Sequence, residues 1–391
     1  MAASTACETQ PVANAFTKAP QASEFRRPER PSFDEVKEAL VGQTLTVPNL
    51  RPLFGHWPQG INPALSSLQS AISGSTENLS PPVEAVGSTE FVLCMERFGM
   101  KPEHRESLID ANVVDFAALC WPEADLEALE FWTHLVMWTW IVEGYTDTLV
   151  ADEAAANVFR SKAKSVWSSM LELGEPESRM DTQAPPQQRQ YQTLIASFKP
   201  FAARFCQMFD LESRQLLLDE LFVYLKGTEL EAKMRSSRQM PSYERYLNMR
   251  MLANGSGFFL VLSGLHKLAG NQAAVGKSPQ WVDLKKTSAT INFLVNDLLS
   301  ANREFKTGEY LNSILLRAYD LHSVDASVAE CVARIKNLVE DYDRQAQSIL
   351  AELKQEDDAR IAAAGAIGAM RSFNVGSLEW RQVAPPFRGD D

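Results

Sequence analysis

The stretch NDLLSANRE, Asn296 to Glu304, carries polar side chains four residues apart in an apolar run. Residues four apart lie on one face of a helix, so Asn296, Ser300 and Glu304 are predicted to form a column of oxygen donors. An amide carbonyl, a hydroxyl and a carboxylate together suit a hard divalent cation such as Mg²⁺. A solvated polar stripe on a surface helix produces the same spacing. The stretch alone therefore indicates either a metal site or an exposed helix face.

The chain around this stretch has the pattern of helices. Apolar residues recur at helical spacing from Leu126 to Leu135, and no alternation of period two with hairpin turns stands out elsewhere. The sequence therefore predicts an all-α protein with a single large domain. The expected helical segments are 122–147, 151–171, 187–209, 213–235, 242–270, the region of 296–304 and 323–353.

Glycines predict two local irregularities in these segments. Gly255 and Gly257 indicate a break within 242–270, because glycine tolerates backbone conformations that end a helix. Gly227 lies near the middle of 213–235 and predicts a kink there.

The ends of the chain differ in composition from the rest. Residues 1–35 are rich in Ala, Ser, Thr, Gln and Pro, which predicts a disordered arm. A transit peptide is the weaker alternative, because Glu8 is acidic and the first arginines come as late as Arg26. The folded domain is expected over 36–380, followed by a tail at 381–391.

Charge and cysteine usage exclude several classes of protein. The net charge is −12 and the pI about 5.1, which argues against a nucleic-acid partner. The five cysteines are scattered, and none forms a C-x-x-C pair, as expected in a reducing compartment, here the cytoplasm. No run of 18 apolar residues occurs, so no membrane span is expected.

The pattern Asn296-Asp297-x-x-Ser300-x-x-x-Glu304 resembles the second metal motif of class I terpene synthases of the microbial, and among these the fungal, sesquiterpene cyclase type. The stretch PSYERYLNMR resembles the family segment that ends in the pyrophosphate-sensing arginine, here Arg250. Arg303, directly before Glu304, stands where the family has a Lys or Arg that reaches the pyrophosphate. In order and spacing these motifs match the family over about 47–380, and the resemblance implies a single-domain helical barrel, the class I terpenoid synthase fold.

The first metal motif of that family, D-D-x-x-D or a close variant, corresponds here to EGYTD. Glu143 replaces the leading aspartate, Gly144 replaces the second, and Asp147 keeps the last acid. Glu143 and Asp147 share a helix face, so the resemblance implies that both are metal ligands together with Asn296, Ser300 and Glu304. Gly144 is the departure from the family pattern that bears on metal occupancy and on catalytic efficiency.

Other residues are placed in the substrate pocket by the same resemblance. Asn254 and Gly255, after Arg250, are the candidates for the residue whose backbone carbonyl faces the substrate. Where the family has a C-terminal Arg-Tyr pair, this chain has Pro386 and Phe387, so the cap on the closed site is in doubt. Candidate wall aromatics, which could also be plain core, are Phe131, Trp138, Tyr145, Phe293 and Trp380.

The resemblance implies a sesquiterpene cyclase that ionises farnesyl diphosphate and cyclises the cation to a hydrocarbon or alcohol. It implies about three Mg²⁺ ions, for which Mn²⁺ can substitute, and a monomer or homodimer. Geranyl or geranylgeranyl diphosphate is the alternative substrate. The alternative functions are a catalytically silent homologue that binds a prenyl diphosphate and a helical interaction protein.

Overall fold

The computed structural model describes residues 30–74, 112–149, 152–175, 186–268, 278–353 and 358–383. The side chains at 71–74, 147–148, 186–190 and 265–266 lie outside this description. The chain divides into a short unit, Met1–Arg30, and a large unit, Pro31–Asp391, and the helices belong to the large one. The predicted arm 1–35 therefore lies almost wholly outside the described residues, although helix α1 already begins at Phe33.

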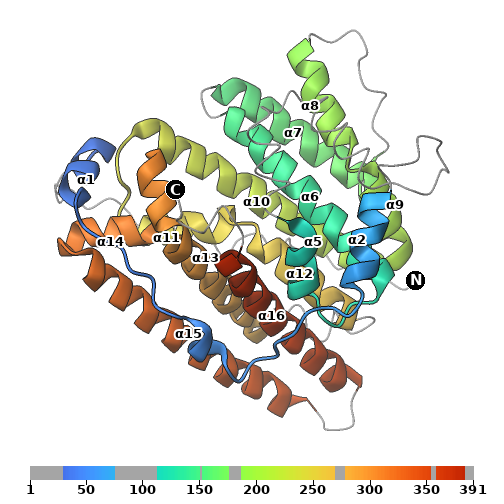
Figure 1. Ribbon diagram of the computed structural model, residues 1–391. Helices are drawn as coiled ribbons and strands as arrows, with labels where there is room; N and C mark the ends of the chain where they lie inside the picture. The colour runs from blue at the N-terminus through green and yellow to red at the C-terminus, as the bar shows by residue number, and fades with distance from the viewer. Residues whose placement is uncertain are drawn as a thin grey trace, which may run out of the picture. The chain divides into compact units, whose positions relative to one another are not determined.

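Every regular element among the described residues is a helix, and the one β-type pairing there is an isolated bridge between Ser32 and Gln239. The all-α prediction is confirmed (Figure 1). The helices are α1 Phe33–Leu40, the 3₁₀ turn η1 Arg51–Phe54, α2 Leu65–Gly74, α5 Val113–Cys120, α6 Leu126–Thr148, α7 Glu153–Met170, α8 Pro186–Ala196, α9 Lys199–Met208, α10 Leu211–Ser237, α11 Tyr243–Ala253, α12 Ser256–Leu268, α13 Pro279–Thr307, α14 Ser313–Leu321, α15 Val324–Glu352 and α16 Asp358–Val383.

Helix α13 is the central element of the bundle. It packs against α11, α12, α14, α15 and α16 and is buried along most of its length (Figure 1). Ser278 caps its first turn by accepting a hydrogen bond from the backbone N–H of Trp281, and Pro279 follows at a position where proline suits a helix. Gly308 ends it in the left-handed region, with φ of 83°. These signals place NDLLSANRE on the last turns of α13.

Helix α16 packs closely on α5, α12 and α13. The approach to α5 depends on Gly376, where a Cβ would lie 2.2 Å from the carbonyl oxygen of Leu119. Only a residue without a side chain permits this distance. The close packing fixes the C-terminal half of α16 against the elements that carry the site.

The predicted segments agree well with the helices, with two differences. Segment 187–209 is two helices, α8 and α9, because Pro200 suits the first turn of a new helix and not the interior of a long one. Gly227, where a kink was predicted, does not interrupt α10, which runs from Leu211 to Ser237. Gly227 instead allows α11 to approach, because a Cβ there would lie 2.4 Å from the backbone nitrogen of Ala253.

None of the helices in the described ranges combines the length and the apolar character that crossing a bilayer requires.

Candidate active site

A cavity of about 510 Å³ opens between the ends of several helices. Its walls come from α5, α6, α10, α11, α12, α13 and α16, with Phe33 of α1 at its edge. The residues lining it are Phe33, Phe116, Trp140, Glu143, Glu231, Arg235, Arg238, Arg250, Asn254, Ser256, Phe259, Asn292, Asn296, Arg303, Glu304, Gly308, Glu309, Tyr310, Leu311, Phe373, Ser377, Trp380 and Arg381.

The break between α11 and α12 lies on the cavity wall, as the glycines predicted. Gly255 has a φ of 67°, a left-handed conformation in which glycine is unstrained. Asn254 Oδ1 accepts hydrogen bonds from Ser256 N at 2.9 Å and from Ser256 Oγ at 2.7 Å, so the Asn254 side chain caps α12. Asn254 and Ser256 line the cavity, whereas Gly255 does not.

Arg250, on the last turn of α11, reaches across to α13. Its Nη2 donates to Asn296 Oδ1 at 2.9 Å, and its Nε donates to Asp297 Oδ1 at 3.3 Å. Burial disfavours the charged guanidinium, but Tyr246 and the Asp297 carboxylate outweigh this and hold the pKa of Arg250 above its usual range. Arg250 is therefore a fixed positive charge on the cavity wall.

Asp297 does not line the cavity, but its carboxylate connects α11, α13 and the start of α14 through hydrogen bonds. Only 1% of Asp297 is exposed. Besides Arg250, its carboxylate accepts hydrogen bonds from the Tyr246 hydroxyl at 2.7 Å and from the backbone N–H of Ser313 at 3.0 Å. A buried carboxylate needs such partners, since an uncompensated charge is costly away from water.

Glu304 lies about two helical turns after Asp297 on α13, at the end of the predicted column. Its Oε2 accepts from Asn312 Nδ2 at 2.9 Å, and Arg303 Nη2 lies 3.4 Å from its Oε1. Burial, and then the neighbouring Asp297 carboxylate, raise the pKa of Glu304 above its usual value. A carboxylate in this position gains from any cation that enters the cavity.

The Ser300 hydroxyl completes the column on α13. Ser300 is fully buried and is not among the residues that line the cavity. Its Oγ has no hydrogen-bond partner of good distance and angle among the described residues, but it lies close enough to Glu304 to lower the pKa of that carboxyl. A buried hydroxyl without a well-formed hydrogen bond, next to a carboxylate, is a pair of oxygens that a divalent cation would satisfy. The residues present therefore fit a metal ion bound by Asn296, Ser300 and Glu304.

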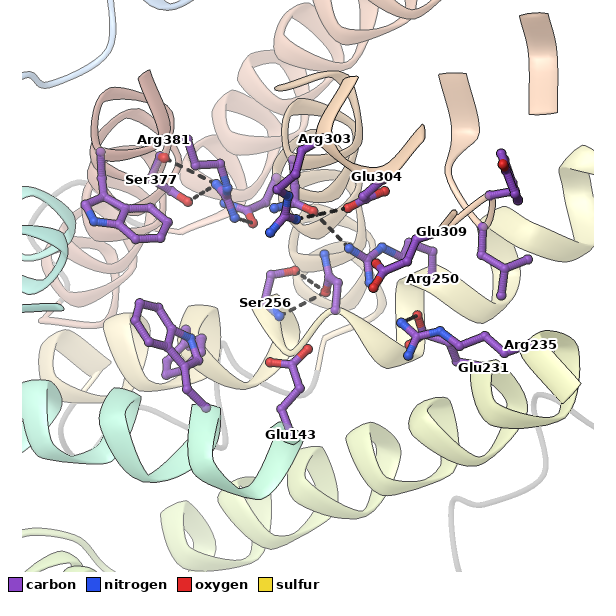
Figure 2. A pocket seen from close by; sticks show the side chains of 18 of the residues that line it. Glu143, Glu231, Arg235, Arg250, Ser256, Arg303, Glu304, Glu309, Ser377 and Arg381 are labelled. Carbon is purple, nitrogen blue, oxygen red and sulfur yellow. Dashed lines mark hydrogen bonds and ion pairs between the residues drawn. The ribbon is translucent and has the colours of Figure 1, made fainter. Parts of the chain in front are cut away.

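Glu143 forms the opposite wall of the cavity. It is exposed, and Figure 2 shows it pointing from α6 into the cavity, across from Ser256. The side chain of Asp147, one turn later on α6, lies outside the described residues. Tyr145 is turned away, since it is buried against Phe159 with ring centroids 5.4 Å apart.

No group of three or more His, Cys, Asp or Glu side chains with the geometry of a metal site occurs among the described residues. The column on α13 is not a group of that kind, because two of its three oxygens are an amide and a hydroxyl. From α6, Glu143 is the described carboxylate that lines the cavity opposite this column.

Comparison with known proteins agrees with this geometry. The family model described as terpene synthase family 2, C-terminal metal binding, matches residues 134–345, which contain α6 from His134 onward, with Glu143, and all of α13. The chain belongs to this family. It is a class I terpene synthase of the microbial type, as the motifs predicted.

Relatives of this terpene synthase are known from several organisms. The sesquiterpene cyclase hepA of Aspergillus oryzae is 25% identical over 329 residues, 82% of this chain and 82% of that protein. The (E)-2-epi-beta-caryophyllene synthase of Selaginella moellendorffii is 25% identical over 290 residues, 69% of each chain.

Solved structures confirm the class I terpene synthase fold. A hedycaryol synthase in complex with HEPES superposes with a TM-score of 0.63 at 15% identity, covering 87% of this chain and all of that one. The germacradien-4-ol synthase from Streptomyces citricolor gives a TM-score of 0.61 at 14% identity, covering 83% of this chain and 96% of that one.

The aromatic wall of this terpene synthase differs from the one expected from sequence. Trp380 lines the cavity as predicted, with its ring centroid 5.1 Å from Phe116 and 5.6 Å from Trp140. Phe259 and Phe373 complete the wall, with ring centroids 6.1 Å apart.

The other predicted wall residues are not brought to the cavity. On α6, Trp138 is two residues from Trp140 and points to the far side of the helix, where it packs on Trp167 and Phe198. Phe131 lies on the same far side, stacked at 6.4 Å on Phe205. Phe293 on α13 is 1% exposed in the core.

The sequence analysis assigned no role to three polar residues of this part of the site. Asp297 and Asn312 orient Arg250 and Glu304, and Arg381 lines the cavity directly after Trp380. The signal for Asp297 was a charged residue amid apolar neighbours on a helix. Arg381 had no such signal, because it stood at the first position of the predicted tail.

Proposed function

We propose that the protein is a sesquiterpene cyclase that ionises farnesyl diphosphate in this cavity and releases diphosphate. The main support for the proposal is that Glu143 lines the same cavity as Arg250, Asn296 and Glu304. Glu143 and Asn296 are far apart in the sequence and belong to different helices. The sesquiterpene cyclase among the relatives supports the choice of a fifteen-carbon substrate.

The polar end of the cavity would hold the diphosphate. Arg250 presents a planar guanidinium, which suits phosphate oxygens and stabilises charge that develops on the departing group. Arg303 lies at the same end of the cavity, on the turn of α13 that carries Glu304. Asp297 keeps the Arg250 side chain in place through the contact at 3.3 Å.

Asn296, Ser300 and Glu304 would bind Mg²⁺ from α13, and Glu143 and Asp147 would bind it from α6. When bound, the ions supply Lewis-acid stabilisation of the diphosphate leaving group. Burial and the Asp297 carboxylate raise the pKa of Glu304, and a bound divalent cation would favour its ionised form.

The aromatic end of the cavity would hold the hydrocarbon chain. Phe116, Trp140 and Trp380 form a continuous surface of rings there, and their faces can stabilise a carbocation. Their apolar surface also excludes water until cyclisation is complete, when the cation loses a proton or takes up one water molecule to give a hydrocarbon or an alcohol.

The second candidate is a catalytically silent homologue that binds a prenyl diphosphate. Gly144 within EGYTD favours it, because the α6 wall then presents fewer carboxylates than the family pattern. The α13 wall argues for catalysis, since Asn292, Asn296 and Glu304 all line the cavity from that helix.

One experiment separates the two candidates. The purified chain is incubated with Mg²⁺ and, in turn, with geranyl, farnesyl and geranylgeranyl diphosphate, and both released pyrophosphate and volatile products are measured. The cyclase gives pyrophosphate and cyclic products from farnesyl diphosphate. A silent homologue is protected by the ligand against thermal unfolding but releases no pyrophosphate, and that result would overturn the proposal.

A further inference from the structure

Arg381 is a cation on the cavity wall that has no carboxylate partner among the described residues. Its Nη1 donates to the Ser377 hydroxyl and, at 3.3 Å, to the Ser377 carbonyl oxygen. Its Nη2 lies 3.4 Å from Asn292 Oδ1. All of these acceptors are neutral, so nothing in the described structure balances the charge of this guanidinium directly.

Burial, and with it the charge of Arg250, lowers the pKa of Arg381 to about 10, although Cys120 and Asp297 act in the opposite direction. Two buried arginines on one wall repel each other. Arg250 is in direct contact with Asp297 at 3.3 Å, whereas Asp297 favours the charge of Arg381 only from a longer distance. Such an arrangement is costly unless an anion enters the cavity.

Donor nitrogens without acceptors gather on the same wall. Arg381 Nε, Asn292 Nδ2 and Asn254 Nδ2 are buried, and none has a hydrogen-bond partner in the described part of the chain. All three residues line the cavity. Figure 2 shows Arg381 on the same side of the cavity as Arg303 and Arg250, across from Glu143. Hydrogen-bond donors without acceptors, next to a guanidinium without a carboxylate partner, suit a ligand with several anionic oxygens.

We propose that Arg381, positioned by Ser377 and Asn292, is a further diphosphate-binding residue of this cavity. This inference rests on the proposed function, because it takes the diphosphate of the prenyl substrate as the anion. Arg381 holds the diphosphate from α16, while Arg250 holds it from α11. It thereby links the last helix of the domain to the leaving group.

The competing explanation is structural. Arg381 ties α16 to α13 through Asn292, and its removal would then lower stability without touching the ligand. The two explanations differ in whether the arginine contributes to binding an isolated diphosphate.

The test measures binding of inorganic pyrophosphate, in the presence of Mg²⁺, by calorimetry and by the rise in melting temperature that it causes. Arg381→Gln is expected to weaken this binding by about ten- to a hundredfold, the usual range for a lost hydrogen bond to a charged group. Arg381→Lys keeps the charge and is expected to retain most of the affinity, which covers the case in which the Gln variant does not fold. Arg344→Gln removes an arginine that is 74% exposed and far from the cavity lining, and it is expected to bind like the wild type.

Turnover of farnesyl diphosphate by the same proteins separates this inference from the proposed function. If the wild type releases pyrophosphate from farnesyl diphosphate, and Arg381→Gln binds pyrophosphate within about twofold of the wild type, Arg381 is a structural tie and the inference is overturned alone. If the wild type neither binds pyrophosphate nor turns over any prenyl diphosphate, the inference and the proposed function fail together.

Discussion

Arg250 is paired within the protein, through Asp297 at 3.3 Å and Asn296 at 2.9 Å. From the sequence alone, its substitution by alanine is expected to lower ionisation severely and leave the fold intact, because the ligand would be its partner. The structure changes that expectation. Removing Arg250 leaves the carboxylate of Asp297 buried with only neutral partners, so Arg250→Ala should lower thermal stability as well as turnover.

The two walls of the cavity can be tested with substitutions that remove charge at nearly constant shape. Glu143→Gln and Glu304→Gln should each lower turnover of farnesyl diphosphate by about a hundredfold or more, because each removes a carboxylate that stabilises the departing diphosphate through the metal. Glu340→Gln, on the exposed face of α15, is the matched control. Steady-state release of pyrophosphate measures all three.

Near-normal turnover in Glu143→Gln with strong loss in Glu304→Gln would contradict this assignment of the α6 wall. The first metal wall would then rest on Asp147, Asp152 or Glu153. Asp147→Asn is expected to be milder than Glu143→Gln, because the resemblance implies that the last acid of the motif is less directly bound.

Glu304 also predicts a dependence of stability on pH. Its folded pKa is raised above the unfolded value near 4.5, so its contribution to stability is present below that pH and is lost as the pH rises through the folded pKa. In excess chelator, Glu304→Gln should therefore be more stable than the wild type at neutral pH and equal to it near pH 4. Thermal unfolding of both proteins across that range measures the difference, and a wild type that is more stable at neutral pH would contradict it.

At the scale of elements, the approach of α16 to α5 sets where Trp380 and Arg381 lie. Gly376→Ala should lower the free energy of unfolding by about 2 kcal/mol or more, because the new Cβ would meet the backbone of Leu119. Gly368, on the same helix, is the matched control. A Cβ there meets nothing within 4 Å, so Gly368→Ala should stabilise the protein by about 0.5–1 kcal/mol.

Urea unfolding of the two variants measures both effects. Equal stabilities for Gly376→Ala and Gly368→Ala would show that α16 can move away from α5 without cost. Turnover of Gly376→Ala should also fall, since Trp380 and Arg381 follow Gly376 on the same helix by about one turn.

The sequence predicted helices well where the pattern is local. Segment 323–353 is α15 within a residue at each end, and the break at Gly255 is where the glycines placed it. The packing role of Gly227 was not predicted, because the residue that requires a glycine there lies on another helix. A single sequence shows that a glycine is present in a helix, but it does not show that Ala253 approaches it.

Of the polar column, Asn296 and Glu304 line the cavity, whereas of the predicted aromatic wall only Trp380 does among the residues that the structure describes. The four-residue spacing of Asn296, Ser300 and Glu304 itself shows that they share one face of the helix. For α6, aromatic residues occur on all sides, so composition does not show which side faces the cavity. Trp140 and Glu143 share that side, three residues apart, and Trp138 lies opposite.

At the scale of the whole molecule, the cavity differs in charge from the chain that builds it. The chain has a net charge of −12, yet arginines outnumber carboxylates among the residues that line the cavity. A local excess of positive charge within an acidic protein favours a small anionic ligand over an extended polyanion. This agrees with a prenyl diphosphate and with the argument from composition against a nucleic-acid partner.

The dependence of pyrophosphate release on Mg²⁺ tests the central claim most directly. Release from farnesyl diphosphate by the wild-type chain is followed while Mg²⁺ is titrated into protein freed of metal by a chelator. The account predicts no release in excess chelator, a rise that saturates with Mg²⁺, and recovery when Mn²⁺ replaces it. Full release in excess chelator, or no release at any concentration of either ion, would contradict it.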